Sequence, residues 1–106
     1  MSEFDEREAA FEKRFALEGD KEFRIRVRRD RLVALWATEW LGVKEDERET
    51  YVAAFVAHNV ASEDSAIAAD LLARFAAANK PMEKERIERK LAASLAEAQA
   101  MEMERR

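Results

Sequence analysis

The sequence predicts an all-α protein, a small antiparallel helical bundle of four to five helices with a more exposed N-terminal helix. The 106 residues are 48% hydrophobic and 40% charged, with two glycines and one proline. Apolar residues recur at the spacing of helical turns. Short breaks, at 19–20, 42, 59–65 and 79–81, divide the chain into helix-length segments. We expect a single domain over 1–106, with an acidic N-terminal arm at 1–19 and a helical bundle at 20–106.

The composition excludes several classes of function. The chain has no cysteine, which removes disulfide scaffolds, thiolate metal sites and cysteine nucleophiles, and its single histidine, His58, has no second histidine to share a metal. Two glycines cannot supply a Gly-rich phosphate loop. No apolar run approaches the ~20 residues that span a bilayer, and the N-terminus shows no secretory signal. We therefore expect no catalytic residues, metal, cofactor or membrane insertion, and no enzymatic activity.

The first predicted helix covers residues 3–18. Phe4, Phe11 and Phe15 form a narrow stripe along it, and the other positions are mostly charged. Acidic residues near its start suit the positive end of the helix dipole. A helix this polar has little apolar surface to hold it, so we expect it to dock through its phenylalanines or to fray. Gly19 is expected to end it, and Asp20 to cap the next helix.

The second predicted helix covers residues 20–41 and ends at Gly42. It has two apolar stripes on roughly opposite sides, which predict a central helix with neighbours on two faces. The first stripe is Ile25, Leu32 and Trp36, and the second is Phe23, Val27, Ala34 and Leu41. Residues 23–28 also alternate with period two, as in a half-buried strand, but no partner strand is evident, so the helix is favoured.

Three further helices are expected at 44–58, 62–78 and 82–101, the second capped by Ser62 and the third positioned by Pro81. His58 is expected at a helix end or half-buried. The residues expected in the core of these helices are Tyr51, Phe55, Ile67, Leu71, Phe75, Ile87, Leu91, Leu95 and Ala98.

The net charge of −4 is unevenly distributed, since residues 1–20 carry −4 and residues 21–41 carry +3. Such asymmetry indicates pairing between segments of the chain or a charged partner, and we favour internal pairing. The arginines of the basic segment spread around more than one helix face, so no nucleic-acid partner is expected. Of the two tryptophans, Trp36 lies on a core stripe, whereas Trp40 is off it and suits a surface role.

Two N-terminal blocks carry a family resemblance. The first is Phe4-Asp5-x-Arg7-Glu8 followed by Phe11-Glu12-x-x-Phe15-Ala16. The second is Phe23, then Arg28-Arg29-x-x-Leu32-x-x-Leu35-Trp36-Ala37-x-Glu39, closing with Leu41-Gly42. A weaker block is Ile87-x-Arg89-Lys90-Leu91 with Leu95-Ala96-Glu97-Ala98. The chain resembles the zeta inhibitory subunits of alphaproteobacterial F-type ATP synthases over nearly its whole length, with Asp30 where Asn is usual.

The resemblance implies a cytoplasmic inhibitor of ATP hydrolysis, monomeric when free and peripheral to the inner membrane through the ATP synthase. Its N-terminal helix would insert between catalytic and non-catalytic subunits of the enzyme's head. The residues implied in this contact are Phe4, Asp5, Arg7, Glu8, Phe11, Glu12 and Phe15, with a secondary contact through Arg28, Arg29 and Trp40. The alternative is a stand-alone helical regulator that binds a small ligand such as a nucleotide, or that stabilises another complex.

Overall fold

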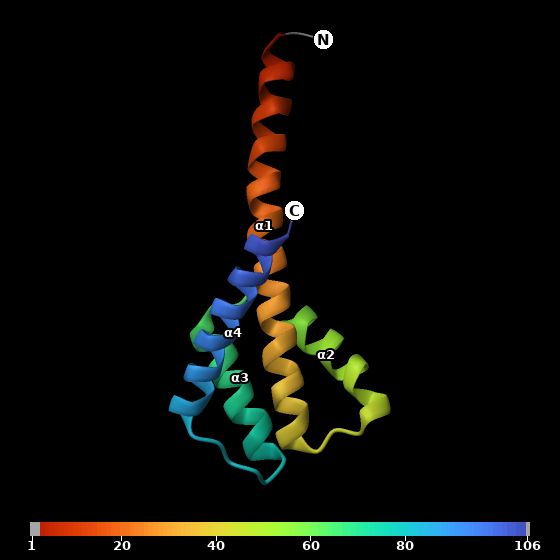
Figure 1. The fold of residues 1–106 in the computed structure, drawn as a ribbon, viewed down its shortest axis with the longest axis vertical. Coiled ribbons are helices and arrows are strands. Elements are labelled where there is room, and N and C mark those ends of the chain that lie inside the picture. Colours follow the sequence, from red (N-terminus) through yellow and green to blue (C-terminus); the bar gives the residue numbers. More distant parts are fainter. Residues whose placement is uncertain (1–2, 106) are drawn as a thin grey trace.

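The computed structural model consists of four helices (Figure 1): α1 (Glu3–Leu41), α2 (Glu45–Asn59), α3 (Asp64–Ala77) and α4 (Lys84–Glu104). It describes the backbone of residues 3–105 and the side chains of residues 19–105. Within that part of the chain there is no strand, and no helix is long and apolar enough to cross a membrane. The prediction of an all-α bundle is confirmed, with four helices.

Helix α1 is continuous from Glu3 to Leu41, so the predicted break at Gly19 is wrong, as is the strand considered at 23–28. A single glycine weakens a helix interior by about 1 kcal/mol but keeps its backbone hydrogen bonds, so the helix can continue through it. The predicted end at Gly42 is confirmed. Gly42 has φ 71°, and the Val43 N–H donates to the Thr38 carbonyl at 3.0 Å, which closes α1 with a left-handed cap.

The bundle is built around the C-terminal half of α1. This half packs against both α2 and α4, and α3 packs against α4. Figure 1 shows α2 and α4 on either side of α1, and the N-terminal part of α1 extending beyond the bundle. The prediction of a central helix with neighbours on two faces is therefore confirmed.

The core consists of large side chains from α2, α3 and α4 against small ones from α1. The predicted core residues Phe55, Ile67, Leu71, Phe75, Ile87, Leu91 and Ala98 are buried, while Tyr51 and Leu95 are half-buried. On α1 the buried side chains are Val33, Ala34, Ala37 and Thr38 together with Arg29 and Asp30. Trp36 lies half-buried against this core and meets the Phe75 ring edge-on, with centroids 5.7 Å apart.

Phe23 differs from its predicted burial, whereas His58 lies at a helix end as predicted. Phe23 is 55% exposed, because it lies near the end of the bundle, one residue before the contact between Arg24 and Glu102 in the last turn of α4. His58 lies in the last turn of α2 and is exposed.

Two predicted helix starts are displaced. Glu63, not Ser62, occupies the N-cap of α3. After Asn79, whose φ is 58°, residues 80–83 form no regular secondary structure, and α4 begins only at Lys84.

Candidate functional site

The residues implied in the inhibitory contact lie on the N-terminal part of α1. The backbone there is helical, but the side chains of Phe4, Asp5, Arg7, Glu8, Phe11, Glu12 and Phe15 lie outside the described residues. The residues of the predicted secondary contact are all described. Arg28 and Trp40 are exposed, whereas Arg29 is only 5% exposed. The structure therefore does not bring these three side chains together on one surface.

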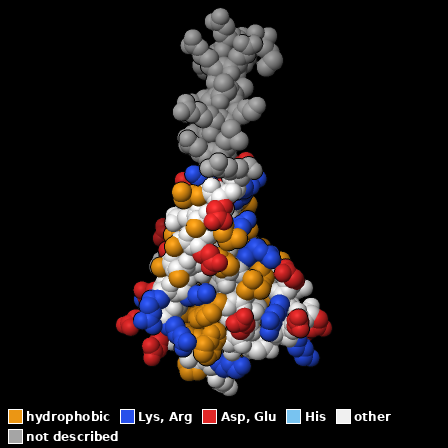
Figure 2. Space-filling view, in the orientation of Figure 1, with side chains coloured by type: hydrophobic (Ala, Val, Ile, Leu, Met, Phe, Trp, Pro, Cys, Tyr) orange, Lys and Arg blue, Asp and Glu red, His pale blue; other side chains and the backbone are white. Residues whose placement is uncertain are grey.

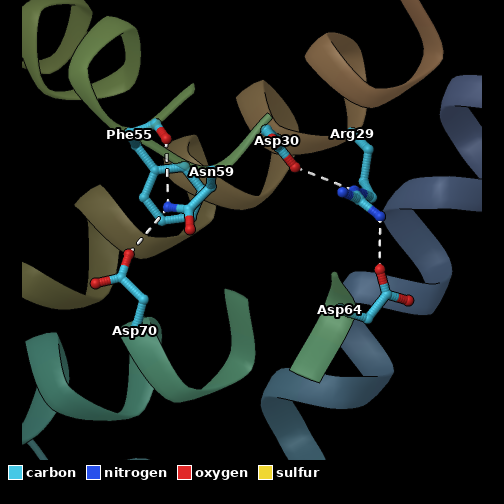
Figure 3. A network of polar contacts seen from close by, with 6 residues as sticks. All are labelled: Arg29, Asp30, Phe55, Asn59, Asp64 and Asp70. Carbon is cyan, nitrogen blue, oxygen red and sulfur yellow. Dashed lines mark hydrogen bonds and ion pairs between the residues drawn. The ribbon is translucent and has the colours of Figure 1, made fainter. Parts of the chain in front are cut away.

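Arg29 is held inside the bundle by two carboxylates (Figure 3). Its Nε donates to Asp30 Oδ1 at 3.0 Å, and its Nη1 donates to Asp64 Oδ1 at 2.7 Å. Asp64 is the first residue of α3, so this contact joins the middle of α1 to the start of α3. Because Arg29 is buried and both of these hydrogen bonds join it to other residues of the bundle, we assign it a structural role. We therefore leave it out of the proposed secondary contact.

Asp30 is fully buried, and its second oxygen, Oδ2, has no hydrogen-bond partner among the described residues. Burial raises the pKa of the Asp30 carboxyl above its ordinary value, and the nearby Asp64 carboxylate raises it further. The charge and hydrogen bond of Arg29 oppose this shift but do not cancel it. The environment of Asp30 therefore stabilises the protonated carboxyl group more than water does.

A second polar group joins α2 to α3. The Asn59 amide donates to the Phe55 carbonyl at 3.3 Å and to Asp70 Oδ2 at 2.9 Å (Figure 3), and Arg74 Nε donates to the same oxygen at 3.0 Å. Burial raises the pKa of Asp70, but the hydrogen bonds from Asn59 and Arg74 outweigh it, so the pKa lies below its ordinary value. The Arg74 guanidinium also covers the Phe55 ring, 5.0 Å from its centroid.

The basic segment of α1 is paired with acids from each of the other helices. Besides Arg29 with Asp64, Arg24 donates to Glu102 of α4 at 2.7 Å, and Arg31 donates to Glu49 of α2 at 3.2 Å. Acidic and basic side chains are accordingly mixed over the face of the bundle in Figure 2. The predicted internal pairing is confirmed for these arginines.

One surface groove combines apolar and basic side chains. It has a volume of about 400 Å³, and we call it the Phe23 groove after the first of the residues that line it. These residues are Phe23, Arg24, Val27, Arg28, Arg31, Leu32, Leu35 and Met101. Phe23, Leu35 and Met101 are its most exposed apolar members, at 55%, 38% and 38%. The groove runs along α1, on the segment that directly follows Gly19.

A second cluster lies at the opposite end of the bundle, around Trp40. The Arg86 guanidinium covers the indole ring, 4.6 Å from its centroid. A cavity of about 720 Å³ is lined by these two residues with Lys80 and Arg89 among others. Sequence reasoning found Trp40 but not these cations, because they lie on the loop before α4 and on α4, far away in the sequence.

The fold is that of an all-helical protein built around one long helix, α1. This helix carries both the paired arginines and the apolar residues of the Phe23 groove. Among the described residues, no group of three or more His, Cys, Asp or Glu side chains could hold a metal ion.

A family model described as ATPase inhibitor subunit zeta matches residues 1–101, so the chain belongs to that family. Comparison with the curated proteins and with the solved structures finds no match. Family membership makes this chain an ATP synthase inhibitor subunit.

Proposed function

We propose that the chain inhibits ATP hydrolysis by inserting its N-terminal helix into the head of the F-type ATP synthase, between catalytic and non-catalytic subunits. The observation that carries this proposal is the family match, which includes the whole arm as well as the bundle. In this division, residues 1–19 are the inhibitory arm and residues 20–106 are the bundle that carries it. The assembly is peripheral to the cytoplasmic side of the inner membrane.

The dimensions of the helices support insertion by the arm. Helix α1 has 39 residues, a length of about 58 Å at the rise of an α-helix. A single helix is roughly 10–12 Å across with its side chains, whereas the whole molecule measures 61 × 29 × 26 Å. An arm of one helix can enter a space between subunits that is too narrow for the bundle.

The chemistry of the arm supports a contact with both apolar and charged groups. Phe4, Phe11 and Phe15 lie on one stripe and suit apolar pockets, since aromatic side chains are frequent anchors of interfaces. The acids Asp5, Glu8 and Glu12 and the base Arg7 suit salt bridges at the entry to such a site. Arg28 and Trp40, both exposed, remain the proposed secondary contact.

The test is hydrolysis of ATP by the F-type ATPase of the source organism, with purified protein added. The full chain is expected to reduce the rate of hydrolysis. The variant Phe11→Ala is expected to need at least a tenfold higher concentration for half inhibition, which corresponds to a loss of about 1.4 kcal/mol or more in binding free energy. Phe11→Ala should leave the thermal midpoint of the free protein nearly unchanged. A full chain without effect on hydrolysis contradicts the proposal.

A second candidate is the binding of a small anionic ligand, supported by the cluster around Trp40. Lys80, Arg86 and Arg89 surround an exposed indole beside a cavity of about 720 Å³. Because the Arg86 guanidinium already covers the Trp40 ring, a ligand that stacks on this ring would displace the guanidinium. Titration of the protein with ATP, followed by tryptophan fluorescence in the wild type and in Trp36→Phe, which leaves Trp40 as the only tryptophan, tests this function. An unchanged signal from Trp40 excludes it.

A further inference from the structure

We propose that the Phe23 groove is a second docking surface for the ATP synthase, and that it binds an amphipathic helix of the enzyme's head whose carboxylates flank apolar side chains. The identity of the enzyme rests on the proposed function. The docking surface and the chemistry of the bound helix follow from three features of the groove, which are its exposed apolar ridge, its charge and its position on α1.

The groove presents an exposed ridge of side chains along α1. Phe23 is 55% exposed, and Leu35 and Met101 are each 38% exposed. Adjacent exposed apolar side chains of this kind mark a place where a partner packs. The residues that form the ridge follow one another at intervals of four, and they are Phe23, Val27, Arg31 and Leu35. The ridge is about 18 Å long at the rise of an α-helix, and a second helix packs against such a ridge.

The charge of the groove selects an acidic partner. Three arginines and no acid line it. Arg24 is paired within the bundle, but Arg28 donates only to a methionine sulfur, at 3.6 Å, and has no carboxylate partner among the described residues. Arg31 is paired with Glu49, yet both side chains are exposed, at 42% and 75%, and such a pair contributes little. Arg28 and Arg31 are therefore available to carboxylates of a partner.

The position of the groove places it beside the enzyme that the arm enters. Helix α1 is continuous through Gly19, and Phe23 lies four residues further on, about 6 Å along the helix axis. Figure 1 shows the last turns of α4, which carry Met101, beside α1 where α1 leaves the bundle. A subunit that encloses the arm as far as Gly19 therefore lies next to the start of the groove.

A second copy of the chain is the other occupant to consider. The acidic stretch that it could offer to the arginines is 1–20, which carries the whole net charge of −4, so the remaining residues are neutral in sum. The proposed function places that stretch inside the ATPase, where it is not available to another copy. The charge of the groove therefore favours the enzyme over a second copy.

Binding of the full chain to the isolated head of the source organism's F-type ATPase, measured by calorimetric titration alongside hydrolysis, tests this surface. Met101→Gln and Phe23→Gln remove apolar contacts, and Arg28→Glu reverses a charge. We expect each to raise the dissociation constant at least about fivefold, and to reach full inhibition at a higher concentration because the arm is intact. Salt should reduce the effect of Arg28→Glu but not that of Met101→Gln, since it screens charges and not apolar contacts.

Matched controls separate the groove from the rest of the surface. Met103→Gln and Arg26→Glu change the same residue types two positions away, and both positions are exposed and outside the groove. We expect neither to change the dissociation constant. Because all five substitutions are at exposed positions, the thermal midpoint of each variant should remain near that of the wild type.

Equal dissociation constants for the groove variants and their controls would overturn the proposal, as would a loss in Arg28→Glu that persists at high salt. A dimer of the free wild type in analytical ultracentrifugation that Met101→Gln abolishes would assign the groove to a second copy instead. Each of these results leaves inhibition by the full chain intact, whereas the proposed function fails only if the full chain does not reduce hydrolysis.

Discussion

Arg29 on α1 donates a 2.7 Å hydrogen bond from Nη1 to the carboxylate of Asp64, the first residue of α3, and so joins two helices that are separated by the whole of α2. The same guanidinium donates to the buried Asp30. One side chain therefore links two helices and also offsets part of the cost of burying the Asp30 carboxylate. Because of this double role, we expect substitutions of Arg29 to destabilise the bundle.

Arg29→Ala should destabilise the protein by about 3–5 kcal/mol, because it leaves the Asp30 carboxylate buried without a partner. Adding Asp30→Asn should recover part of that loss, since the amide carries no charge. The free energies of unfolding in urea for the two single variants and the double variant measure this coupling. Equal values for Arg29→Ala with and without Asp30→Asn would contradict the assigned role.

The pH dependence of stability should change in Asp30→Asn. Burial raises the pKa of Asp30 in the folded state, so its ionisation destabilises the fold: stability is lost as the pH rises from the unfolded pKa through the raised folded pKa. We expect wild type and variant to be similar below pH 3 and the variant to be the more stable at pH 7. Thermal midpoints across this range check the sign. A variant less stable at pH 7 would show that Asp30 acts mainly through its charge pair with Arg29.

The two tryptophans should differ in their effect on stability. Trp36 packs edge-on against Phe75 in the core, so Trp36→Ala is expected to cost about 3–5 kcal/mol. Trp40 is 43% exposed, and Trp40→Ala should cost less than about 1 kcal/mol. Urea unfolding of both variants provides the comparison, with Trp40→Ala as the matched control. Similar losses would contradict the placement of Trp36 against the core.

The parts of the fold that depend on residues close together in the sequence could be predicted from the sequence. Helical spacing correctly places Phe55, Ile67 and Phe75 in the core, and Gly42 ends α1 through local backbone geometry. The prediction of a break at Gly19 failed because a glycine inside a helix costs only about 1 kcal/mol relative to alanine. This cost is too small to break a long helix such as α1.

The polar core could not be predicted because its partners are distant in sequence. Arg29 was implied in the secondary contact, and nothing near it in the sequence indicates its partner Asp64, thirty-five residues later. Phe23 appeared as a core residue, but α4 ends beside its neighbour Arg24 and leaves it exposed. The arm residues implied by the family remain a prediction, because their side chains lie outside the described part of the chain.

Salt should affect the speed of inhibition more than its extent. Residues 1–20 carry a net charge of −4, and long-range attraction to basic groups at the entry would accelerate encounter more than it strengthens the final contact. Raising ionic strength shortens the range of such attraction. Time courses of ATP hydrolysis at several salt concentrations should show a slower onset and a similar plateau at saturating protein. An onset that does not respond to salt would exclude electrostatic guidance by the arm.

The central claim is that the N-terminal arm is the inhibitory element, and the most direct measurement is hydrolysis by the F-type ATPase with the full chain and with a chain of residues 20–106. The shorter chain retains every core residue found in the part of the chain whose side chains are described, so we expect it to unfold cooperatively. We predict inhibition by the full chain and none by residues 20–106 at any concentration. A shorter chain that folds and inhibits as well as the full chain would contradict the account and transfer the inhibitory role to the bundle.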